Sequence, residues 1–597
     1  MVSQGGNQGG SGSNSGAAGG AGPRRTGAGP GKAGRPERKS PLGGKGGAGF
    51  GGKSFGKAQG ERSGFGQRAG GAGKGAGGAG KSGTFFRKDA EAHPERRSGI
   101  KAEKLPPGAR IRALWLLNAV LIEGRTLAAA LPEATAGLEP SEAARAGRLA
   151  TDTLRHMGRA DRMLSPYLRL KPTEPVMNLL RLATIELARG GAAHGVVHAA
   201  VTLARQLPDT AAAAGLANAV LRRVSEKLVP LETLPVPTLP KSLRKQLVAA
   251  WGKEAVAAME QVFTQSPPVD LTSKDGGSLA ETLGGTALPT GSTRLTEARQ
   301  ISALPGFETG VFWVQDAAAA LPALVLAPKP GEKVLDLCAA PGGKTLQLAA
   351  AGATVTALDL SAERMARVAE NLQRTGLSAE LVVADALSWP KAAPKAKAAP
   401  GAALAGAWDG SAPVASTDFP EDQQFDAILL DAPCSATGTI RRHPDLPHLR
   451  AEAELAPLLV LQAKLIDRAF ALLRPGGRLV FCTCSLLPEE GELQAKAALA
   501  RLPGLSRDAK ATQNLAGTEA FACAPGEIRT RPDHWAEMGG IDGFYIAAFR
   551  KASPGAPAEA EVTEPAQVAA PIQDTAPAKE LAEAEFAALS PEGNSKA

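Results

Sequence analysis

Apolar residues recur with a helical period through the second hundred residues of the chain. Val176, Leu180, Ala183 and Leu187 stand at positions i, i+4, i+7 and i+11, which places them on one stripe of a helix. Similar segments, joined by short connections, follow one another between residues 105 and 230. The pattern predicts an all-α bundle with helices at residues 110–123, 142–157, 176–187, 196–207 and 210–228.

The next hundred residues, 231–330, change character. They open with Pro235, Pro237 and Pro240, a composition typical of a linker between domains. A helical pattern covers residues 243–263, and short mixed segments follow it. We expect a small α+β domain that links the bundle to the remainder of the chain.

From residue 331 short apolar segments rich in β-formers alternate with helical ones. One helix, 361–375, carries the usual end signals, with Ser361 as its N-cap and Gly376 just beyond its end. Such alternation gives a mostly parallel sheet with helices on both faces, so residues 331–551 predict a doubly wound, Rossmann-like α/β domain. The expected strands are 333–338, 354–359, 380–385, 425–431, 478–484 and 544–549.

Three segments differ from these domains in composition. The first hundred residues of the arm 1–104 hold 17 Lys or Arg against 5 Asp or Glu, and the tail 552–597 holds 2 against 8. Both, like the low-complexity insertion 390–420, have too few aliphatic residues to offset the entropy of ordering, so we expect disorder. Phenylalanines among the basic residues of the arm suit loose contact with a polyanion, although a flexible solubilising tail has the same composition.

Apolar content and cysteine usage indicate a cytoplasmic protein. The chain has no run of 18 apolar residues and no apolar signal-peptide core. Its cysteines lack the spacing of a disulfide framework, and free thiols are expected in a reducing compartment. We expect no membrane partner, and nothing in the sequence indicates an obligate protein partner. The cysteines are Cys338, Cys434, Cys482, Cys484 and Cys523.

The turn after the first predicted parallel strand has the composition of a ligand site. It consists of Cys338, Ala339, Ala340, Pro341, Gly342, Gly343 and Lys344. Its glycines allow a ligand close to the backbone, and the helix that follows favours a carboxylate at its N-terminus. A phosphate-binding loop would need a glycine where Cys338 stands, which disfavours nucleotide triphosphate hydrolysis.

Aspartates end the next two predicted strands. Asp359 is placed to accept hydrogen bonds from ribose hydroxyls, and Asp385 is placed to meet an adenine amino group. A single strand-end aspartate is more often a turn or cap residue. The series of three strand ends is what favours a ligand, and it predicts S-adenosylmethionine as the cofactor.

Two further strand ends carry reactive side chains. Asp431 and Cys434 close the fourth predicted strand, and Cys482 and Cys484 close the fifth. Because parallel strands share their carboxyl edge, these ends meet the crevice of the glycine turn. Cys482 and Cys484 point to the same face of a strand, but only Cys484 is near enough to the edge to reach the crevice. Core packing is our interpretation of Cys482.

The motifs at these strand ends occur in a recognisable order. They read Asp-Leu-Cys-Ala-Ala-Pro-Gly-Gly-Lys-Thr (336–345), Asp-Ala-Pro-Cys-Ser-x-Thr-Gly (431–438) and Thr-Cys-Ser-x-x-x-x-Glu (483–490). In this order they resemble the RNA cytosine-C5 methyltransferases of the Sun/Nop2 family. Ala436 departs from that pattern, because the family usually has glycine there.

The helical region carries a second resemblance. Gly-Leu-Ala-Asn-Ala-Val-Leu-Arg-Arg-Val (215–224) is similar to a segment of the NusB-like RNA-binding domain, although an unrelated helical bundle remains an alternative. With this domain in front, residues 105–551 resemble those family members that methylate small-subunit (16S) ribosomal RNA.

The resemblance implies a division of labour among the site residues. It implies that Cys484 adds to C6 of the cytosine and that Cys434 assists release of the product. Asp431 would hold the edge of the base, and Lys344 or a neighbouring cation would help to keep Cys484 ionised. DNA cytosine-C5 methyltransferases attack with the Pro-Cys cysteine instead, so the Thr-Cys-Ser motif favours RNA.

Arg441 and Arg442 follow the second motif and are candidates for contact with RNA phosphates, or else part of a solvated basic loop. No metal is expected, since the cysteines lack histidines at compatible spacing. A disulfide between Cys434 and Cys484 is geometrically feasible in an oxidised sample.

The rival functions are a non-catalytic RNA-binding assembly or antitermination factor, and a methyltransferase acting on transfer RNA or 23S rRNA.

Overall fold

The computed structural model describes Ala102 and residues 105–297, 299–390, 424–450, 455–513 and 515–553. Apart from a few residues, the predicted arm 1–104, the insertion 390–420 and the tail 552–597 lie outside this described part. Within it, no helix is both long enough and apolar enough to cross a bilayer.

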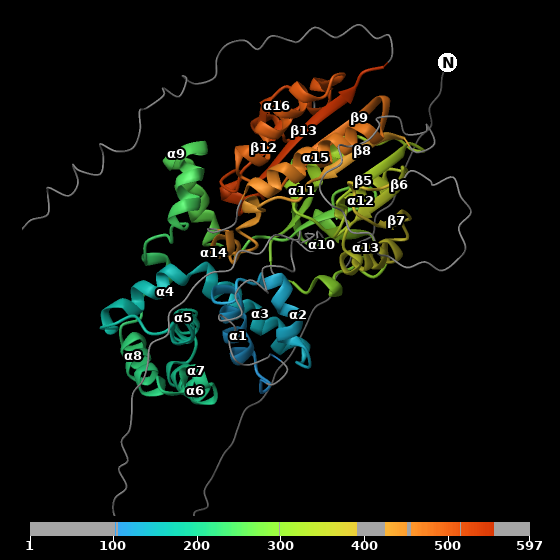
Figure 1. Ribbon diagram of the computed structural model, residues 1–597. Helices are drawn as coiled ribbons and strands as arrows, with labels where there is room; N and C mark the ends of the chain where they lie inside the picture. Colours follow the sequence, from blue (N-terminus) through green and yellow to red (C-terminus); the bar gives the residue numbers. More distant parts are fainter. Residues whose placement is uncertain are drawn as a thin grey trace, which may run out of the picture. The chain divides into compact units, whose positions relative to one another are not determined.

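Helices fill the region from residue 109 to residue 226 (Figure 1). Four predicted helices lie within three residues of their expected ends, whereas the fifth, 210–228, is divided in two. Two short helices were not predicted, because eight or nine residues give too few turns for a periodic pattern to register. The helices are α1 (Ala109–Leu121), α2 (Leu127–Thr135), α3 (Pro140–Arg155), α4 (Met157–Leu164), α5 (Glu174–Ala188), α6 (Ala193–Gln206), α7 (Pro208–Ala211) and α8 (Ala214–Glu226).

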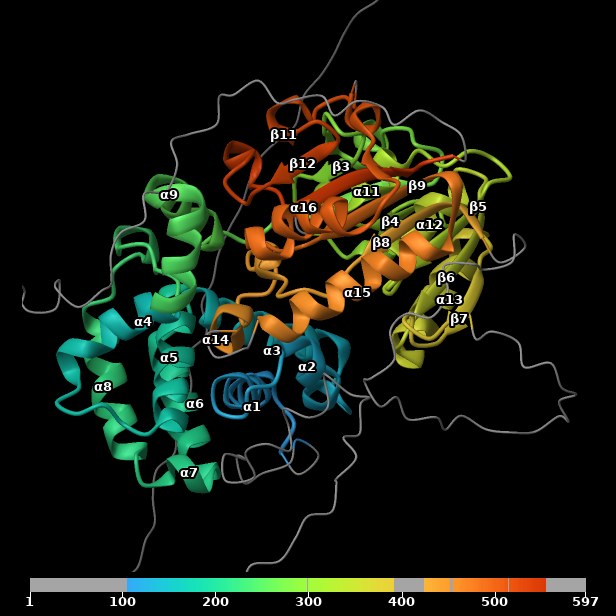
Figure 2. The ribbon, with the colours of Figure 1, turned by 45° about the horizontal axis from the view of Figure 1, so that its top comes forward.

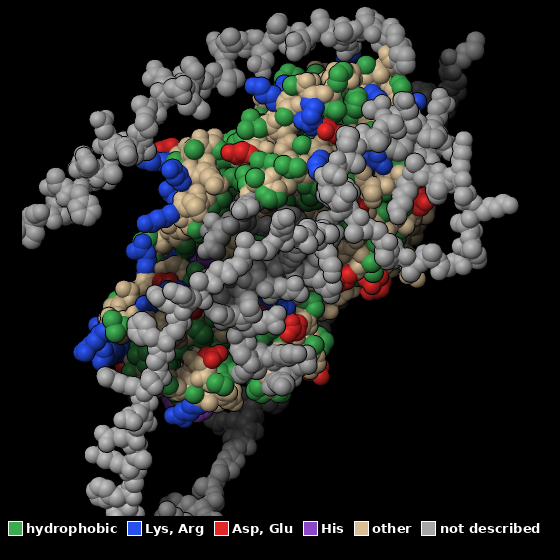
Figure 3. All heavy atoms as spheres, in the orientation of Figure 1, with side chains coloured by type: hydrophobic (Ala, Val, Ile, Leu, Met, Phe, Trp, Pro, Cys, Tyr) green, Lys and Arg blue, Asp and Glu red, His purple; other side chains and the backbone are tan. Residues whose placement is uncertain are grey.

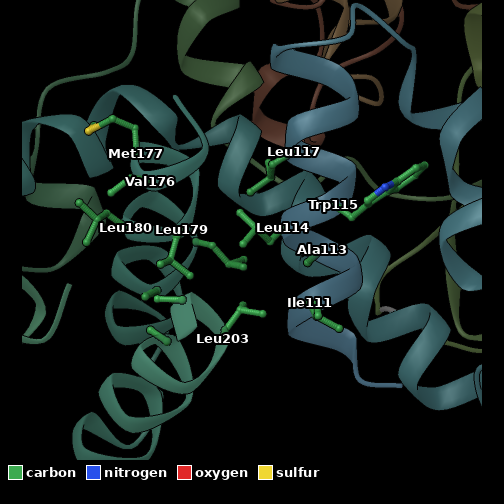
Figure 4. Close-up of a cluster of buried hydrophobic side chains, with 14 of the residues drawn as sticks. Ile111, Ala113, Leu114, Trp115, Leu117, Val176, Met177, Leu179, Leu180 and Leu203 are labelled. Atoms are coloured by element: carbon green, nitrogen blue, oxygen red, sulfur yellow. The ribbon is translucent and has the colours of Figure 1, made fainter. Parts of the chain in front are cut away.

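The core of this bundle lies around α5. The predicted stripe is buried, but so are Leu179, Leu182 and Ile185 on its other faces. Figure 4 shows leucines of α1 and α5 directed at one another. Among them Asn178 Nδ2 donates to Asn118 Oδ1 at 2.9 Å, so these two buried amides pair with each other. The helix is therefore central rather than amphipathic, and the predicted all-α region is confirmed.

The linking region contains one long helix and a small sheet. Helix α9 (Lys241–Phe263) is interrupted at Gly252, whose φ of 82° is not helical. An antiparallel sheet follows, in the order β2-β3-β1-β4. The strands of this sheet are β1 (Asp270–Ser273), β2 (Gly285–Ala287), β3 (Thr293–Leu295) and β4 (Phe312–Val314), and the short helix α10 (Ala280–Leu283) lies between β1 and β2 in the chain.

The third region is built on a large sheet in the order β11-β12-β13-β9-β8-β5-β6-β7, with β10 paired to β13. The five strands from β9 to β7 are parallel, and the others pair antiparallel. The strands are β5 (Lys333–Leu337), β6 (Thr354–Asp359), β7 (Glu380–Val383), β8 (Phe425–Asp431), β9 (Leu473–Thr483), β10 (Leu505–Arg507), β11 (Ala522–Ala524), β12 (Glu527–Thr530) and β13 (Phe544–Lys551).

This sheet confirms the predicted α/β domain and extends it. Sequence periodicity missed β10, β11 and β12, which are three or four residues long and therefore too short to show alternation. Strand β9 begins at Leu473, five residues before its predicted start, and its pairing with β8 shifts register across residues 474–477. The chain leaves β5 toward β6 and β7 and returns to β8 on the other side of β5, so the strand order reverses between β5 and β8.

Helices cover both faces of the large sheet (Figures 1 and 2). Alternate residues of β8 show the period of two: Ile428 and Leu430 pack under α15 and α16, whereas Ala427 and Leu429 pack under α11 and α12. The helices are α11 (Ala317–Leu326), α12 (Gly343–Ala350), α13 (Ala362–Thr375), α14 (Leu446–Arg450), α15 (Ala456–Leu472) and α16 (Glu492–Arg501).

Candidate active site

The carboxyl ends of the parallel strands carry the predicted site residues. Cys338 directly follows β5, Asp359 is the last residue of β6, and Asp385 lies two residues beyond β7. Asp431 is the last residue of β8, and Cys484 directly follows β9. Because β5 and β8 are neighbours at the reversal of strand order, the glycine turn and Asp431 lie at the place where such sheets bind ligands.

The glycine turn closes tightly between β5 and α12. Gly342 has a φ of 104°, and a Cβ on it would lie 3.0 Å from a methyl carbon of Val368, so a side chain would be strained there. The turn is closed by a hydrogen bond from Gly342 N to Ala339 O at 2.9 Å. No side chain caps α12, which leaves backbone N–H groups of its first turn free to bind a ligand.

The two acids predicted for the nucleoside are placed differently. Asp359 is 4% exposed, and its carboxylate accepts hydrogen bonds from Ala340 N at 3.2 Å and from Ser361 N at 2.9 Å. It also lies 3.4 Å from a guanidinium nitrogen of Arg364. Asp385 is exposed and accepts from Leu387 N at 3.0 Å. Asp359 is thus tied to the glycine turn, whereas Asp385 stands apart at the end of a neighbouring strand.

Lys344 binds Asp431. Its Nζ lies 2.8 Å from Asp431 Oδ2 and 5.1 Å from the ring centroid of Phe544. Burial alone would lower the pKa of Lys344, but Asp431 and other nearby negative groups outweigh it, and the pKa is raised. Lys344 is thus paired with Asp431, and the expectation that Lys344 or a neighbouring cation helps to keep Cys484 ionised stays a prediction. The other oxygen of Asp431 lies 3.6 Å from Cys482 Sγ.

The structure brings Cys434 and Cys484 together, with 3.5 Å between their sulfur atoms. Both are partly buried, whereas Cys482 is wholly buried in the apolar core on the same face of β9. The contact with Cys484 raises the pKa of Cys434 well above its ordinary value, and burial and the charges of Cys484 and Glu490 add to the effect. The raised pKa favours the neutral thiol of Cys434 over its thiolate.

Arg441 and Arg442 do not lie in a solvated loop. The side chain of Arg441 is 0% exposed, and its guanidinium group pairs with Asp316 and with Asp542, the latter at 2.5 Å. Arg442 pairs with the same two aspartates and donates to Pro268 O at 3.1 Å. Burial alone would raise the pKa of Asp316, but the two guanidinium groups hold it well below its usual range. Arg441 is a buried structural residue, so its prediction as a phosphate contact is corrected.

Sequence reasoning gave no role to several residues that shape this site. Asp336 is fully buried in β5, and burial raises its pKa to about 7 even though Thr345 Oγ1 donates to it at 2.6 Å. Glu490, quoted only as part of a motif, is buried beside both cysteine loops. No local signal in the sequence marks the ion pairs of Asp316 and Asp542, since their arginine partners are 100 or more residues away. Ala436 has a φ of 57°, a conformation that favours the glycine usual at this place.

Among the described residues, no group of three or more His, Cys, Asp or Glu side chains is arranged to hold a metal ion. The features present are a doubly wound parallel sheet, a glycine turn at its strand reversal, acids at the adjacent strand ends and two touching thiols. Together they define the class I methyltransferase type of fold with a cysteine pair at its site.

Comparison with known proteins agrees with this class. Residues 323–550 match the family model described as 16S rRNA methyltransferase RsmB/F, and residues 107–226 match the model of the NusB family. A protein of Pseudomonas putida named ribosomal RNA small subunit methyltransferase B is 36% identical over 472 residues, which cover 74% of this chain and 98% of the relative. The protein of the same name in Vibrio vulnificus is 33% identical over 475 residues, which cover 74% of this chain and 99% of that relative.

The chain therefore belongs to the RsmB/F family of 16S rRNA methyltransferases and carries that family's NusB-type helical region. A crystal structure titled PH0851 superposes with a TM-score of 0.55, covering 75% of this chain and 99% of that one. At 21% identity the superposition shows a shared fold.

Proposed function

We propose that this chain transfers a methyl group from S-adenosylmethionine to C5 of a cytosine in 16S rRNA, through a covalent bond between Cys484 and C6 of the base. The observation that carries the proposal is the contact of Cys434 and Cys484, 3.5 Å apart, beside the glycine turn of a methyltransferase fold. A protein that only bound RNA would need neither thiol.

The glycine turn fits the amino-acid end of S-adenosylmethionine. The uncapped N-terminus of α12 offers N–H groups to a carboxylate, and Gly342 leaves room for it. Asp336 Oδ1 is buried without a hydrogen-bond partner in the described residues. It can therefore accept a hydrogen bond from the ammonium group of the cofactor, or from a water molecule bound to that ammonium group. We assign the ribose hydroxyls to Asp359 and the adenine amino group to Asp385. The bound cofactor supplies an electrophilic methyl group.

The thiols perform complementary steps. Cys484 as a thiolate adds to C6, and the electron pair of the C5=C6 bond becomes available at C5 for methylation. Release reverses the addition: a base such as water takes the C5 proton, C5=C6 re-forms, and the C6–S bond breaks with its electrons on Cys484 sulfur. The neutral thiol of Cys434, 3.5 Å away, can donate its proton to that sulfur. Asp431, held by Lys344, would face the edge of the base.

The proposed RNA substrate requires a basic surface away from Arg441. Figure 3 shows Lys and Arg side chains gathered at the margin over α9, where Lys241, Lys245 and Lys253 are exposed. Exposed lysines of this kind suit contact with phosphates. The target cytosine must leave its stack for Cys484 to reach C6 from above the ring, which favours a loop or a flipped nucleotide.

Bisulfite sequencing of total RNA from cells with and without the gene tests the activity. We expect one cytosine of 16S rRNA to lose its methylation in the deletion strain and to regain it with the wild-type gene. Loss at a transfer RNA or 23S rRNA cytosine would overturn the substrate, and no loss at any cytosine would overturn the reaction.

The roles of the two thiols are separable by trapping. Cys434→Ala should accumulate a covalent protein–RNA adduct on a denaturing gel because release fails, whereas Cys484→Ala should form none because addition fails. Cys523→Ala, which removes an exposed thiol outside the pair, is the matched control and should turn over normally. An adduct in Cys484→Ala but none in Cys434→Ala would reverse the assignment.

A further inference from the structure

One carboxylate connects the two loops that carry the catalytic thiols. Glu490 is 0% exposed, and its Oε1 accepts hydrogen bonds from Ser435 N at 2.9 Å and from Gln462 Nε2 at 3.1 Å. Its Oε2 accepts from Ser485 Oγ at 2.6 Å. Burying a carboxylate is costly unless such donors replace its water. The three donors therefore replace the water that the buried Glu490 carboxylate loses, and they fix its position.

The donors on either side are the chain neighbours of the thiols. Ser435 follows Cys434, and Ser485 follows Cys484. The two serine hydroxyls also lie 3.1 Å apart, so the residues after both thiols meet each other as well as the carboxylate. The position of Glu490 thereby limits how far the two sulfur atoms can separate.

Further hydrogen bonds join the same loops a few residues on. Gly438 N donates to Cys484 O at 2.9 Å, and Leu486 N donates to Thr437 Oγ1 at 2.9 Å. The loop after β8 and the loop after β9 are thus joined at several points. Among these joints Glu490 is the one that bonds the residues directly after both thiols, Ser435 and Ser485.

Arg529 shows that Glu490 is not simply half of an ion pair. This arginine donates to Ser485 O in the same loop, and its carboxylate partner is Glu492 rather than Glu490. The bonds of Glu490 go to a backbone N–H, an amide and a hydroxyl instead, which are groups that fix direction rather than only neutralise charge.

We propose that Glu490 is a positioning residue that holds the Cys434 thiol against Cys484 and thereby sets the rate at which the methylated base is released. The inference rests on the proposed function, because it assigns Glu490 to the second half of that reaction. It acts through Cys434, since its carboxylate is buried and already accepts hydrogen bonds from Ser435 N, Gln462 Nε2 and Ser485 Oγ.

The two thiols depend on Glu490 to different extents. Cys484 directly follows β9, which is held between β8 and β13, so its place is secured by the sheet. Cys434 lies three residues beyond the end of β8 and relies on loop contacts. Loss of the carboxylate should therefore displace Cys434 more than Cys484, and slow release more than addition.

The test compares Glu490→Ala, Glu490→Gln and Glu489→Ala in the full-length chain with unmodified 16S rRNA. Glu489 is exposed and adjacent, so its variant is the matched control. Covalent adduct on denaturing gels, single-turnover methyl transfer and the Kd for S-adenosylmethionine are measured for each. We expect Glu490→Ala to keep its cofactor Kd and to release product about tenfold more slowly or worse, with accumulated adduct.

Glu490→Gln keeps an oxygen for Ser435 N and should restore part of the release rate, while Glu489→Ala should match the wild type. The inference is overturned if Glu490→Ala releases product at the wild-type rate without accumulated adduct. It is equally overturned if the variant loses cofactor binding and adduct formation together, since the role would then be general stability. A wild-type protein that transfers no methyl group to RNA defeats the proposed function itself, and the inference with it.

Discussion

Asp316 and Asp542 both pair with Arg441 and with Arg442. Replacing Arg441 with alanine would remove the first arginine and leave Arg442 in contact with both carboxylates. The Arg441 side chain is 0% exposed, and the two aspartates are 8% and 3% exposed. Arg442 already contacts both carboxylates, at 2.5 Å and 3.2 Å. The variant therefore buries two negative charges against one positive charge.

The expected cost follows from this arrangement. Removing one partner of a buried ion pair typically destabilises a protein by about 3–5 kcal/mol. Because Arg442 still neutralises part of the charge, we expect the lower end, about 3 kcal/mol. For a domain of this size that corresponds to a fall in Tm of about 6–12 °C.

Thermal unfolding followed by circular dichroism measures the loss, at low and at high salt. A buried network is screened little by salt, so the difference in Tm between variant and wild type should persist. Arg367→Ala, which removes an exposed arginine of α13, is the control and should change Tm little. The affinity for 16S rRNA is measured in parallel at a temperature where both variants are folded.

The opposite pattern would refute the reasoning. If Arg441→Ala left Tm unchanged while weakening RNA binding, and did so less at high salt, Arg441 would be a phosphate contact after all. A fall in Tm with unchanged RNA affinity is the result that the buried network requires.

Two further outcomes are expected. In Gly438→Ala the new Cβ would lie 1.9 Å from Gly543 O, a backbone atom that cannot move without breaking the hydrogen bond of 2.8 Å from Gly543 N to Gly438 O, so methyl transfer should be lost. The control Gly195→Ala has open space around its Cβ and should be active. An active Gly438→Ala in the same single-turnover assay would contradict the geometry. Burial raises the pKa of Asp336 to about 7, above the unfolded value of about 3.9, so its contribution to stability is full below about pH 4 and is lost as pH rises through about 7. Asp336→Asn should flatten the dependence of Tm on pH across that window, and an unchanged pH dependence would exclude Asp336 as its source.

The sequence by itself determined the local features of this protein. A period of about 3.6 identified the main helices, and a period of two placed Cys482 and Cys484 on one face of a strand, because both patterns report how a single segment meets the core. The strand-end acids and motifs indicated the edge where a ligand binds, and the resemblance they carry indicated the reaction. Short elements such as α4 and β10 escaped prediction because their patterns do not repeat.

Tertiary structure alone decided which charges and loops meet. Arg441 looked like a surface cation because it stands in the basic run of Arg441, Arg442 and His443, yet its partner Asp316 is 125 residues away in the chain. Glu490 stood in a motif without a role of its own, and only the fold brings its carboxylate to the residues that follow both thiols. Lys344 could have served either cysteine or carboxylate, and the pairing of β5 with β8 set it on Asp431. Such partners are chosen by the packing of distant strands, and the energy of burying a charge makes that choice decisive.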